Sequence, residues 1–146
     1  MRKRTPNGAQ KTRICIAFPG LNGELEVILA ETYDGMIVLP GGVMEEGEEP
    51  NKTIHREVLE ETGIVLDDTK LCIEKLLYLG TITAGRKVHL FWQMLNEKPK
   101  TVQPRKFDSI KKVFSVSFDK VSENLTSKQQ KKIWESICKK IAVLQQ

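Results

Sequence analysis

A glycine-rich loop that runs into a helix with clear start and stop signals constrains the fold of this chain most. Residues 40–49 hold three glycines and are followed by Pro50. Proline suits the first turn of a helix, because its missing N–H group needs no partner there. Gly63 can adopt the left-handed conformation that ends a helix. We therefore expect a helix that starts at Pro50, ends just before Gly63 and docks on a sheet through Ile54 and Val58.

Three carboxylates share one side of this expected helix. With Glu57 at 0° on a helical wheel, Glu60 falls at about −60° and Glu61 at about +40°. Like charges at this spacing destabilise a helix, so their gathering favours a bound cation such as Mg²⁺, which prefers oxygen ligands. Arg56 could orient one of the carboxylates through a bidentate bond. Solvated surface charge is the alternative explanation for an acidic helix.

The spacing of the surrounding residues favours the metal site. It reads Gly42, five residues, Glu48, seven residues, Arg56-Glu57-Val58, one residue, Glu60-Glu61, one residue, Gly63-Ile64. This 23-residue pattern resembles the Nudix box at all nine of its fixed or class-restricted positions. Outside the box, residues 39–42 and 87–95 most resemble the MutT branch of the Nudix hydrolases.

The resemblance implies roles for individual groups. It implies metal ligands at Glu57, Glu61, Glu60 and the backbone carbonyl of Gly41. It implies supporting positions at Glu48, Gly42 and Gly63. The cofactor that it implies is Mg²⁺, with Mn²⁺ as a substitute.

The reaction that the resemblance implies is hydrolysis of a diphosphate linkage by metal-activated water. Glu57 is our first choice as the general base, oriented by Arg56, with Glu60 as a further catalytic residue. Members of the family differ at this step. Asp108 and Glu97, in the polar loop before the last expected strand, therefore remain alternatives.

Apolar runs between turn signals predict the strands. We expect strands at residues 12–19, 25–30, 36–39, 70–83, 87–95 and 110–118. Asn22-Gly23 predicts a hairpin turn between the first two. These elements give an α+β chain, and the resemblance implies the Nudix fold, a mixed β-sheet sandwiched between α-helices (an α/β/α sandwich).

A second long helix is expected at residues 127–144. Thr126 and Gln129 have the spacing of a capping box at its start. Apolar residues recur at helical spacing and define an expected buried face, namely Ile133, Ile137, Ile141 and Leu144.

Length and composition suit a single domain over residues 1–146. The three cysteines form no disulfide or zinc pattern, and we find neither a secretory signal nor a membrane-spanning run, so we expect a cytoplasmic protein. The net charge of +4 is uneven. Residues 1–11 are expected to form a basic, flexible tail, whereas residues 41–62 hold seven glutamates. An acidic segment in a basic protein favours a cation site that attracts anionic ligands.

A nucleoside triphosphate, oxidised forms included, is the default substrate, cleaved to the monophosphate and pyrophosphate. The proline typical of ADP-ribose hydrolases is absent at Leu79-Gly80, and the tyrosine typical of diadenosine polyphosphate hydrolases is absent at Thr81-Ile82. Candidate substrate contacts are Asn124, Arg86, Phe91 and Asp108, with Lys87 and Arg13 as further candidates for the phosphates. Turn chemistry is the alternative role for Asn124, and core packing is the alternative for Phe91.

Two other functions remain open from the sequence. The lysine-rich C-terminal third would suit a very anionic non-nucleotide diphosphate, such as a diphosphoinositol polyphosphate. A catalytically silent, nucleotide-sensing Nudix domain is the other possibility, but such domains usually lose box carboxylates and none is missing here. The expected partner is the nucleotide or other organic diphosphate, with no membrane and no specific nucleic acid. We expect a monomer or a homodimer.

Overall fold

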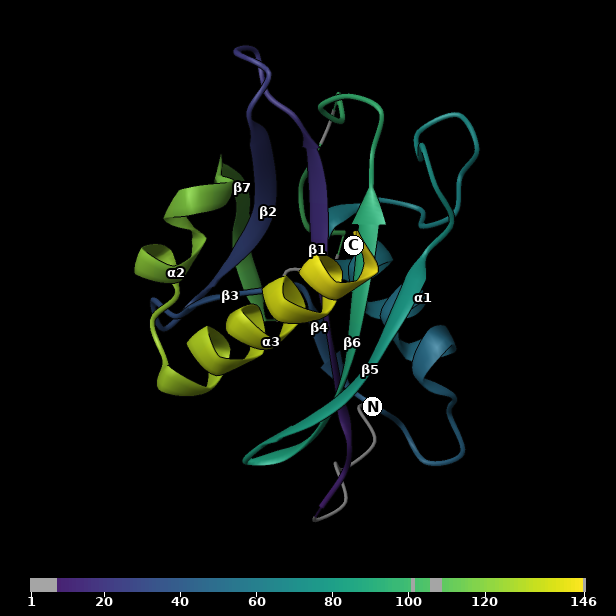
Figure 1. The fold of residues 1–146 in the computed structure, drawn as a ribbon. Helices are drawn as coiled ribbons and strands as arrows, with labels where there is room; N and C mark the ends of the chain where they lie inside the picture. The colour runs from purple at the N-terminus through teal and green to yellow at the C-terminus, as the bar shows by residue number, and fades with distance from the viewer. Residues whose placement is uncertain (1–7, 101, 106–108, 146) are drawn as a thin grey trace.

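The computed structural model describes residues 8–100, 102–105 and 109–145 (Figure 1). Its strands are β1 (Lys11–Pro19), β2 (Leu25–Thr32), β3 (Ile37–Val38), β4 (Gly41–Val43), β5 (Leu77–Ala84), β6 (Arg86–Met94) and β7 (Ile110–Ser117). Its helices are α1 (Pro50–Thr62), α2 (Val121–Asn124) and α3 (Lys128–Leu144), and a 3₁₀ turn, η1 (Phe118–Lys120), precedes α2.

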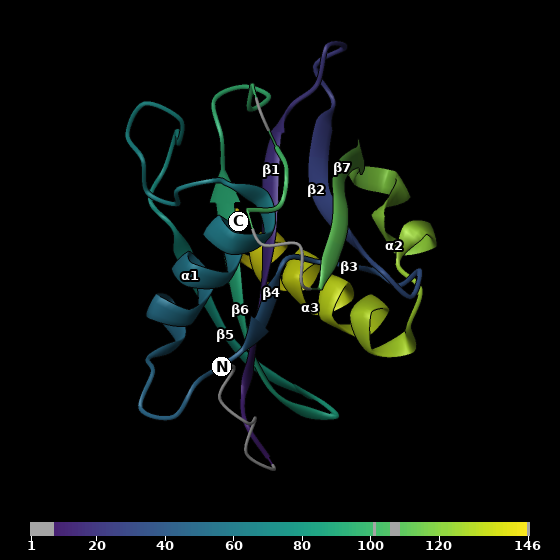
Figure 2. The same ribbon diagram turned by 180° about the vertical axis from the view of Figure 1, so that it is seen from behind.

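Strand β1 organises the sheet. One of its edges pairs in parallel with β6, and the other pairs antiparallel with β4 at residues 11–13 and with β2 at residues 17–19. β2 also pairs with β3 and β7, and β6 also pairs with β5. The mixed seven-stranded sheet carries α3 on one face and α1 on the other (Figures 1 and 2). The predicted sandwich is therefore confirmed.

Alternation of side chains along β1 fills both layers of the core. Cys15 and Ala17 belong to the cluster under α3, which also holds Val88 and Leu90 of β6. Ile14, Ile16 and Phe18 belong to the cluster under α1. Each face of the sheet is therefore apolar, as a central strand covered on both sides requires.

Helix α1 has the bounds that its local signals predict. Pro50 occupies the first turn, and Gly63 takes a left-handed conformation with φ 79°. The Gly63 N–H group donates to the carbonyl of Leu59 at 3.0 Å. Ile54 and Val58 are fully buried, so they dock the helix as predicted.

Helix α3 covers the predicted residues, but two details of its prediction are wrong. Its N-cap is Ser127, whose Oγ accepts the Gln130 N–H at 3.0 Å, so Thr126 and Gln129 do not form a capping box. Thr126 is instead tied to β3, since its Oγ1 accepts the Ile37 N–H at 3.1 Å. Leu144 is 61% exposed, so it is not part of the buried face.

Two strand predictions also need correction. Residues 41–43, expected in a loop, form β4, because β1 offers them a pairing partner from a distant part of the chain. Residues 70–76, expected in a strand, form a loop with a single bridge between Cys72 and Leu95. Asp67 holds this loop in place, since its carboxylate accepts the Leu76 N–H at 2.8 Å.

The described part of the predicted N-terminal tail contacts the sheet. Lys11 is the first residue of β1, and the carbonyl of Gln10 accepts the Met44 N–H at 2.8 Å. Residues 1–7 lie outside the described residues. Among the helices that the structure describes, none is both long and apolar enough to cross a membrane.

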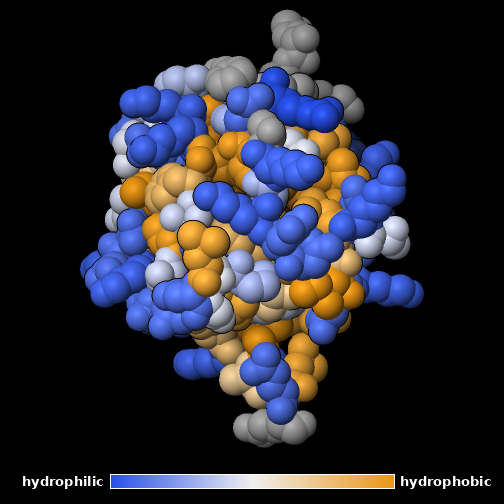
Figure 3. All heavy atoms as spheres, turned by 90° about the horizontal axis from the view of Figure 1, so that it is seen from above, coloured by the Kyte–Doolittle hydropathy of each residue, from blue (hydrophilic) through white to orange (hydrophobic). Residues whose placement is uncertain are grey.

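The loops at one end of the molecule leave some apolar side chains in contact with solvent. Leu21 in the β1–β2 turn, and Val65 and Ile73 in the loop between α1 and β5, are exposed. Figure 3, which views this end, shows hydrophobic residues interspersed with hydrophilic ones. Singly exposed apolar residues of this kind are ordinary on a protein surface.

Candidate active site

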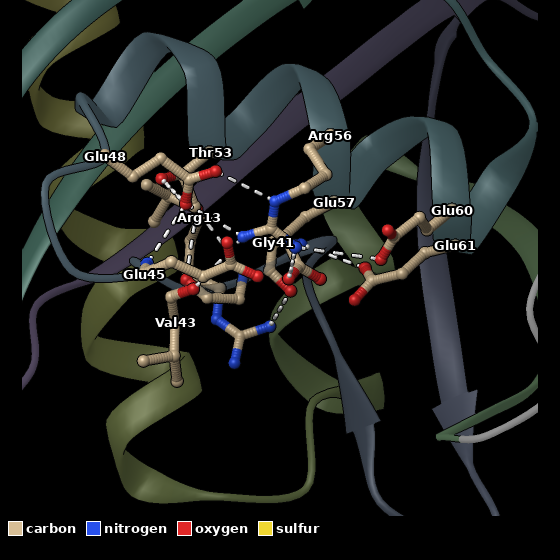
Figure 4. A network of polar contacts seen from close by, with 12 residues as sticks. Arg13, Gly41, Val43, Glu45, Glu48, Thr53, Arg56, Glu57, Glu60 and Glu61 are labelled. Atoms are coloured by element: carbon tan, nitrogen blue, oxygen red, sulfur yellow. Dashed lines mark hydrogen bonds and ion pairs between the residues drawn. The ribbon is translucent and has the colours of Figure 1, made fainter. Parts of the chain in front are cut away.

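The carboxylates of Glu57, Glu60 and Glu61 leave the same side of α1, as the wheel predicts, but their surroundings differ (Figure 4). Glu61 is 8% exposed and accepts the Gly41 N–H at 3.0 Å. The side chain of Glu57 is 13% exposed and lies against Gly42. Glu60 is more open, and its carboxylate lies 3.7 Å from the guanidinium of Arg56.

Arg56 links two parts of the predicted box. Its Nε and Nη2 donate to the two carboxylate oxygens of Glu48, each at 2.9 Å. Its Nη1 donates to Oε1 of Glu57 at 2.8 Å. Glu48 also accepts from the Thr53 hydroxyl at 2.6 Å and from the Glu45 N–H at 3.0 Å. The loop before α1 is thereby fastened to the helix, and Arg56 is held in one orientation toward Glu57.

Charges in this network are strongly stabilised. Hydrogen bonding from Arg56 lowers the pKa of Glu48 to about 2. The same hydrogen bonds, which Arg56 donates to Glu48, raise the pKa of Arg56 above its usual value. The pair is therefore ionised at any physiological pH and acts as a fixed element of the site.

The pKa values of Glu57 and Glu61 are raised, unlike that of Glu48, because both carboxyl groups are largely buried and they contact each other. Burial raises the pKa of Glu57, and Arg56 opposes this effect. Burial also raises the pKa of Glu61, to about 8, and a hydrogen bond to Glu57 adds to the shift, whereas the charge of Arg13 opposes it. Burial therefore disfavours the ionised form of both carboxyl groups.

A divalent cation would offset the cost of burying two ionised carboxylates together. The carboxylates of Glu57 and Glu61 converge here and offer oxygen ligands, beside the Gly41 N–H group, which donates to Glu61. The carbonyl of Gly41 lies 3.4 Å from Nη1 of Arg13. Mg²⁺ is commonly held by one or two carboxylates and keeps several waters. Within the described residues, no three His, Cys, Asp or Glu side chains already converge on one point, so Glu60 would have to turn from Arg56 to ligate directly.

Two glycines allow the main chain to approach the carboxylates. A Cβ atom at Gly41 would lie 2.1 Å from the carbonyl oxygen of Thr12, and the φ of 140° favours glycine. A Cβ atom at Gly42 would lie 2.5 Å from the carboxyl carbon of Glu57. Gly41 is therefore required by the β1–β4 pairing, whereas Gly42 makes room for Glu57.

Gly42→Ala is expected to lower turnover by at least about tenfold while the fold persists, because the group that the added Cβ displaces is a side-chain carboxylate, that of Glu57, and not the main chain. Gly47→Ala is the matched control: Gly47 has a φ of 77° in the same loop but meets no atom within 4 Å of its added Cβ. The control is expected to lose about 1 kcal/mol of unfolding free energy and no activity. Thermal unfolding and steady-state kinetics test both variants, and equal turnover in the two would contradict the role of Gly42.

The raised pKa of Glu61 makes the stability of the metal-free protein depend on pH. A carboxyl group has a pKa of about 4.3 in an unfolded chain, whereas Glu61 has one of about 8 in the fold. Folded chains therefore bind more protons between these values. The stability that this proton contributes is complete below the unfolded pKa and is lost as the pH rises through the folded one.

We expect the melting temperature in EDTA to fall between pH 5 and 8.5 and the gain in melting temperature on adding Mg²⁺ to grow over the same range, since the metal ion holds the ionised form. Glu61→Gln keeps an acceptor for Gly41 and has no proton to lose, so its profile in EDTA should be flatter. A wild-type profile as flat as that of the variant would refute the assignment.

The candidate substrate contacts fall in different places. Arg86 starts β6, beside β1, and its Nη1 donates to the Ala9 carbonyl at 3.3 Å. Asn124 ends α2 and donates from Nδ2 to the Lys120 carbonyl at 2.8 Å, which is turn chemistry. Phe91 is 2% exposed in the core under α1, which agrees with the alternative of core packing. Asp108 lies outside the described residues.

Arg13 is closer to the carboxylates than its sequence context indicates. It is the cross-strand partner of Gly41, and its Nη1 donates to the carbonyl of Leu39 at 2.7 Å and toward that of Gly41 at 3.4 Å. Its Nε is buried without a hydrogen-bond partner among the described residues. The sequence gives one indication that Arg13 has a special role, namely that it is a charged residue inside an otherwise apolar strand.

Comparison with known proteins agrees with the geometry. Residues 11–136 match the NUDIX domain family, while no curated protein sequence matches the chain significantly. The fold is similar to that of a Nudix hydrolase from M. smegmatis, RenU (TM-score 0.68, 15% identity, 94% of this chain and 88% of that one). It is also similar to the NUDIX domain of Shewanella oneidensis NrtR complexed with ADP ribose (TM-score 0.69, 16% identity, 93% of this chain and 90% of that one).

A C. elegans Ap4A hydrolase has the same fold (TM-score 0.68, 17% identity, 91% of this chain and 98% of that one). At these identities the solved structures establish the fold alone. The family match extends over most of the chain and establishes the family. The chain belongs to the Nudix family of pyrophosphohydrolases.

Proposed function

We propose that this protein is a Mg²⁺-dependent hydrolase of a diphosphate linkage in a nucleoside diphosphate-linked substrate, with nucleoside triphosphates, oxidised forms included, as the main class. The products are then the nucleoside monophosphate and pyrophosphate. The observation that carries the proposal is that the carboxyl groups of Glu57 and Glu61 lie together, both largely buried, beside the main chain of Gly41. A pair of this kind becomes favourable in the ionised form when a cation lies between its members.

The residues of the site would have separate roles in metal binding and proton transfer. Glu57 and Glu61, with the carbonyl of Gly41, would hold Mg²⁺, and Mn²⁺ would fit the same oxygen donors. The bound ion supplies positive charge near the phosphates and lowers the pKa of nearby water. Glu57, to which Arg56 donates at 2.8 Å, would accept the proton of the attacking water. Arg56 and Glu48 prevent that carboxylate from rotating away.

Water labelled with ¹⁸O tests which bond breaks. The oxygen of water forms a bond to one phosphorus, the bridging P–O bond breaks, and the leaving phosphate keeps the bridging oxygen. Label in the nucleoside monophosphate means attack on the phosphorus next to the nucleoside, and label in pyrophosphate means attack on the next one. Our proposal of release as monophosphate and pyrophosphate fails if orthophosphate is the first product.

A substrate panel tests the function itself. It should contain nucleoside triphosphates and their oxidised forms, ADP ribose, diadenosine polyphosphates and a diphosphoinositol polyphosphate, each with Mg²⁺ and then with EDTA. ADP ribose and Ap4A belong in the panel because two similar structures bind or are named for them. We expect turnover of the triphosphates that EDTA abolishes. Specific binding without turnover of any member would favour the sensing function instead.

A further inference from the structure

A cavity lies beside α1, on the face of the sheet that this helix covers. Its floor is formed by Phe18 of β1, Ile28 of β2 and Val113 of β7, which belong to the core cluster under α1 or pack against it. The loop between β6 and β7 forms the opposite wall, and Figure 2 shows this loop on the same side of the sheet as α1, between that helix and β7. The cavity has a volume of about 320 Å³, which is at the lower end of the range of about 300–1,000 Å³ for small-molecule sites.

Main-chain bonds to α1 hold the loop that forms this wall. The Gln103 N–H group donates to the carbonyl of Thr62 at 3.2 Å, and the Arg105 N–H group donates to the carbonyl of Glu60 at 2.8 Å. Both carbonyls belong to the last turn of α1, where no later residue of the helix can bond to them. Val102 lines the cavity and packs against the cluster under α1. The loop is therefore fixed to the helix, and a space remains between the loop and β7.

Two lysines supply the charge on the loop side of the cavity. Lys98 and Lys100 line the cavity and are exposed, whereas Pro99, between them, lines it and is buried. Neither lysine forms an ion pair with a described acidic side chain. None of the described residues that line the cavity is acidic. The rim therefore has two ammonium groups that are available to an anion.

The rest of the lining offers an apolar surface. Ser115 is the other polar residue, and its Oγ already donates to Oε1 of Glu26 at 2.7 Å. Phe18, Phe114 and Pro99 contribute rings, which suit contact with another ring. An apolar cavity with charge of one sign at its rim fits a ligand that has an aromatic body and an anionic group.

The cavity is separate from the carboxylate site. Phe18, in its floor, lies five positions beyond Arg13, the cross-strand partner of Gly41. At about 3.3 Å per strand residue, the two positions are about 16 Å apart. The partner of β1 at Phe18 is β2 and not β4. A ligand with one or two rings in the cavity therefore does not reach the carboxylates of α1.

We propose that this cavity is a second ligand site, which binds a small molecule that has an aromatic body and a single anionic group. The aromatic body would lie against Phe18 and Val113, and the anionic group would lie at Lys98 and Lys100. This inference goes beyond the proposed hydrolysis, since none of these residues belongs to the carboxylate site.

Two probes with the same ring and opposite charge test the ligand class. We expect calorimetric titration of the full chain to show binding of naphthalene-2-sulfonate that weakens as KCl is added. Binding of 2-naphthylmethylammonium should be weaker by about tenfold or more. Lys98→Gln and Lys100→Gln should each weaken binding of the sulfonate by about threefold, whereas Lys139→Gln, at an exposed position of α3, should change it by less than about 1.5-fold. No saturable binding of the sulfonate, equal binding of the two probes or equal loss in all three variants would overturn the inference.

Two further variants test where the sulfonate binds. Val113→Phe should abolish binding, because the larger ring fills the cavity, and circular dichroism checks its fold. Glu57→Gln should bind the sulfonate as the wild type does. Amide shifts in NMR spectra of the wild type give the location whether or not Val113→Phe folds, and we expect them at the cavity lining. Shifts centred on α1, or loss of binding in Glu57→Gln, would overturn the second site and leave the proposed function intact, whereas absence of Mg²⁺-dependent turnover would overturn the proposed function alone.

Discussion

Replacing Glu57 with glutamine is expected to reduce kcat by about 10²–10⁴-fold, the usual contribution of a positioned general base, and by more if the carboxylate also holds the metal ion. The amide has nearly the same shape, but it cannot accept a proton from water and is a poor ligand for Mg²⁺. The fold should persist, because the variant removes a buried carboxylate whose pKa is raised by burial.

Steady-state turnover over a range of Mg²⁺ concentrations measures this effect, with circular dichroism and thermal unfolding as checks on the fold. Glu46→Gln, an exposed glutamate in the loop before α1, is the control and should match the wild type. The melting temperature of Glu57→Gln in EDTA should equal or exceed that of the wild type. Unchanged turnover would remove Glu57 from the mechanism.

Replacing Arg56 with methionine is expected to have the largest effect on stability, with a loss of about 2–3 kcal/mol in the free energy of unfolding. The side chain of Glu48 is 6% exposed and that of Glu57 is 13% exposed, so both would lose the partner of a largely buried charge. The figure is below that for a fully buried pair because Arg56 itself is 26% exposed and water screens part of the interaction.

Urea unfolding in EDTA measures the loss as a shift in midpoint at constant slope. Arg56→Lys should lie between the methionine variant and the wild type, because lysine keeps the charge but cannot bond both oxygens of Glu48 and also reach Glu57. Lys52→Met, at an exposed position of the same helix, serves as the control. If methionine and lysine are equally tolerated at residue 56, the bidentate contact contributes nothing to the fold.

The helix that carries the site was predictable because its signals are local. Pro50 and Gly63 set its ends, and Ile54 and Val58 set its buried side, so the wheel placed the carboxylates correctly. The contact from Arg56 to Glu57 also followed from adjacency on one helix. Roles of these residues in catalysis and metal binding remain predictions that the experiments above test.

Features that depend on distant parts of the chain were not predictable. β4 exists only because β1 pairs with it, and nothing within Gly41–Val43 signals a strand. The closeness of Arg13 to Glu61 depends on the same pairing. The difference in environment between Glu60 and Glu61 depends on which of them the loop at Gly41 covers, and a helical wheel contains no such information.

The position of β1 between partners from distant parts of the chain has a consequence for synthesis on the ribosome. Its antiparallel partners, β2 and β4, emerge soon after it, but its parallel partner β6 ends at Met94. A nascent chain that has just completed α1 holds every box residue and still lacks β6, whose Phe91 belongs to the core under that helix. The carboxylates would therefore take up their arrangement in the site only after β6 has been synthesised, well after the residues that carry them.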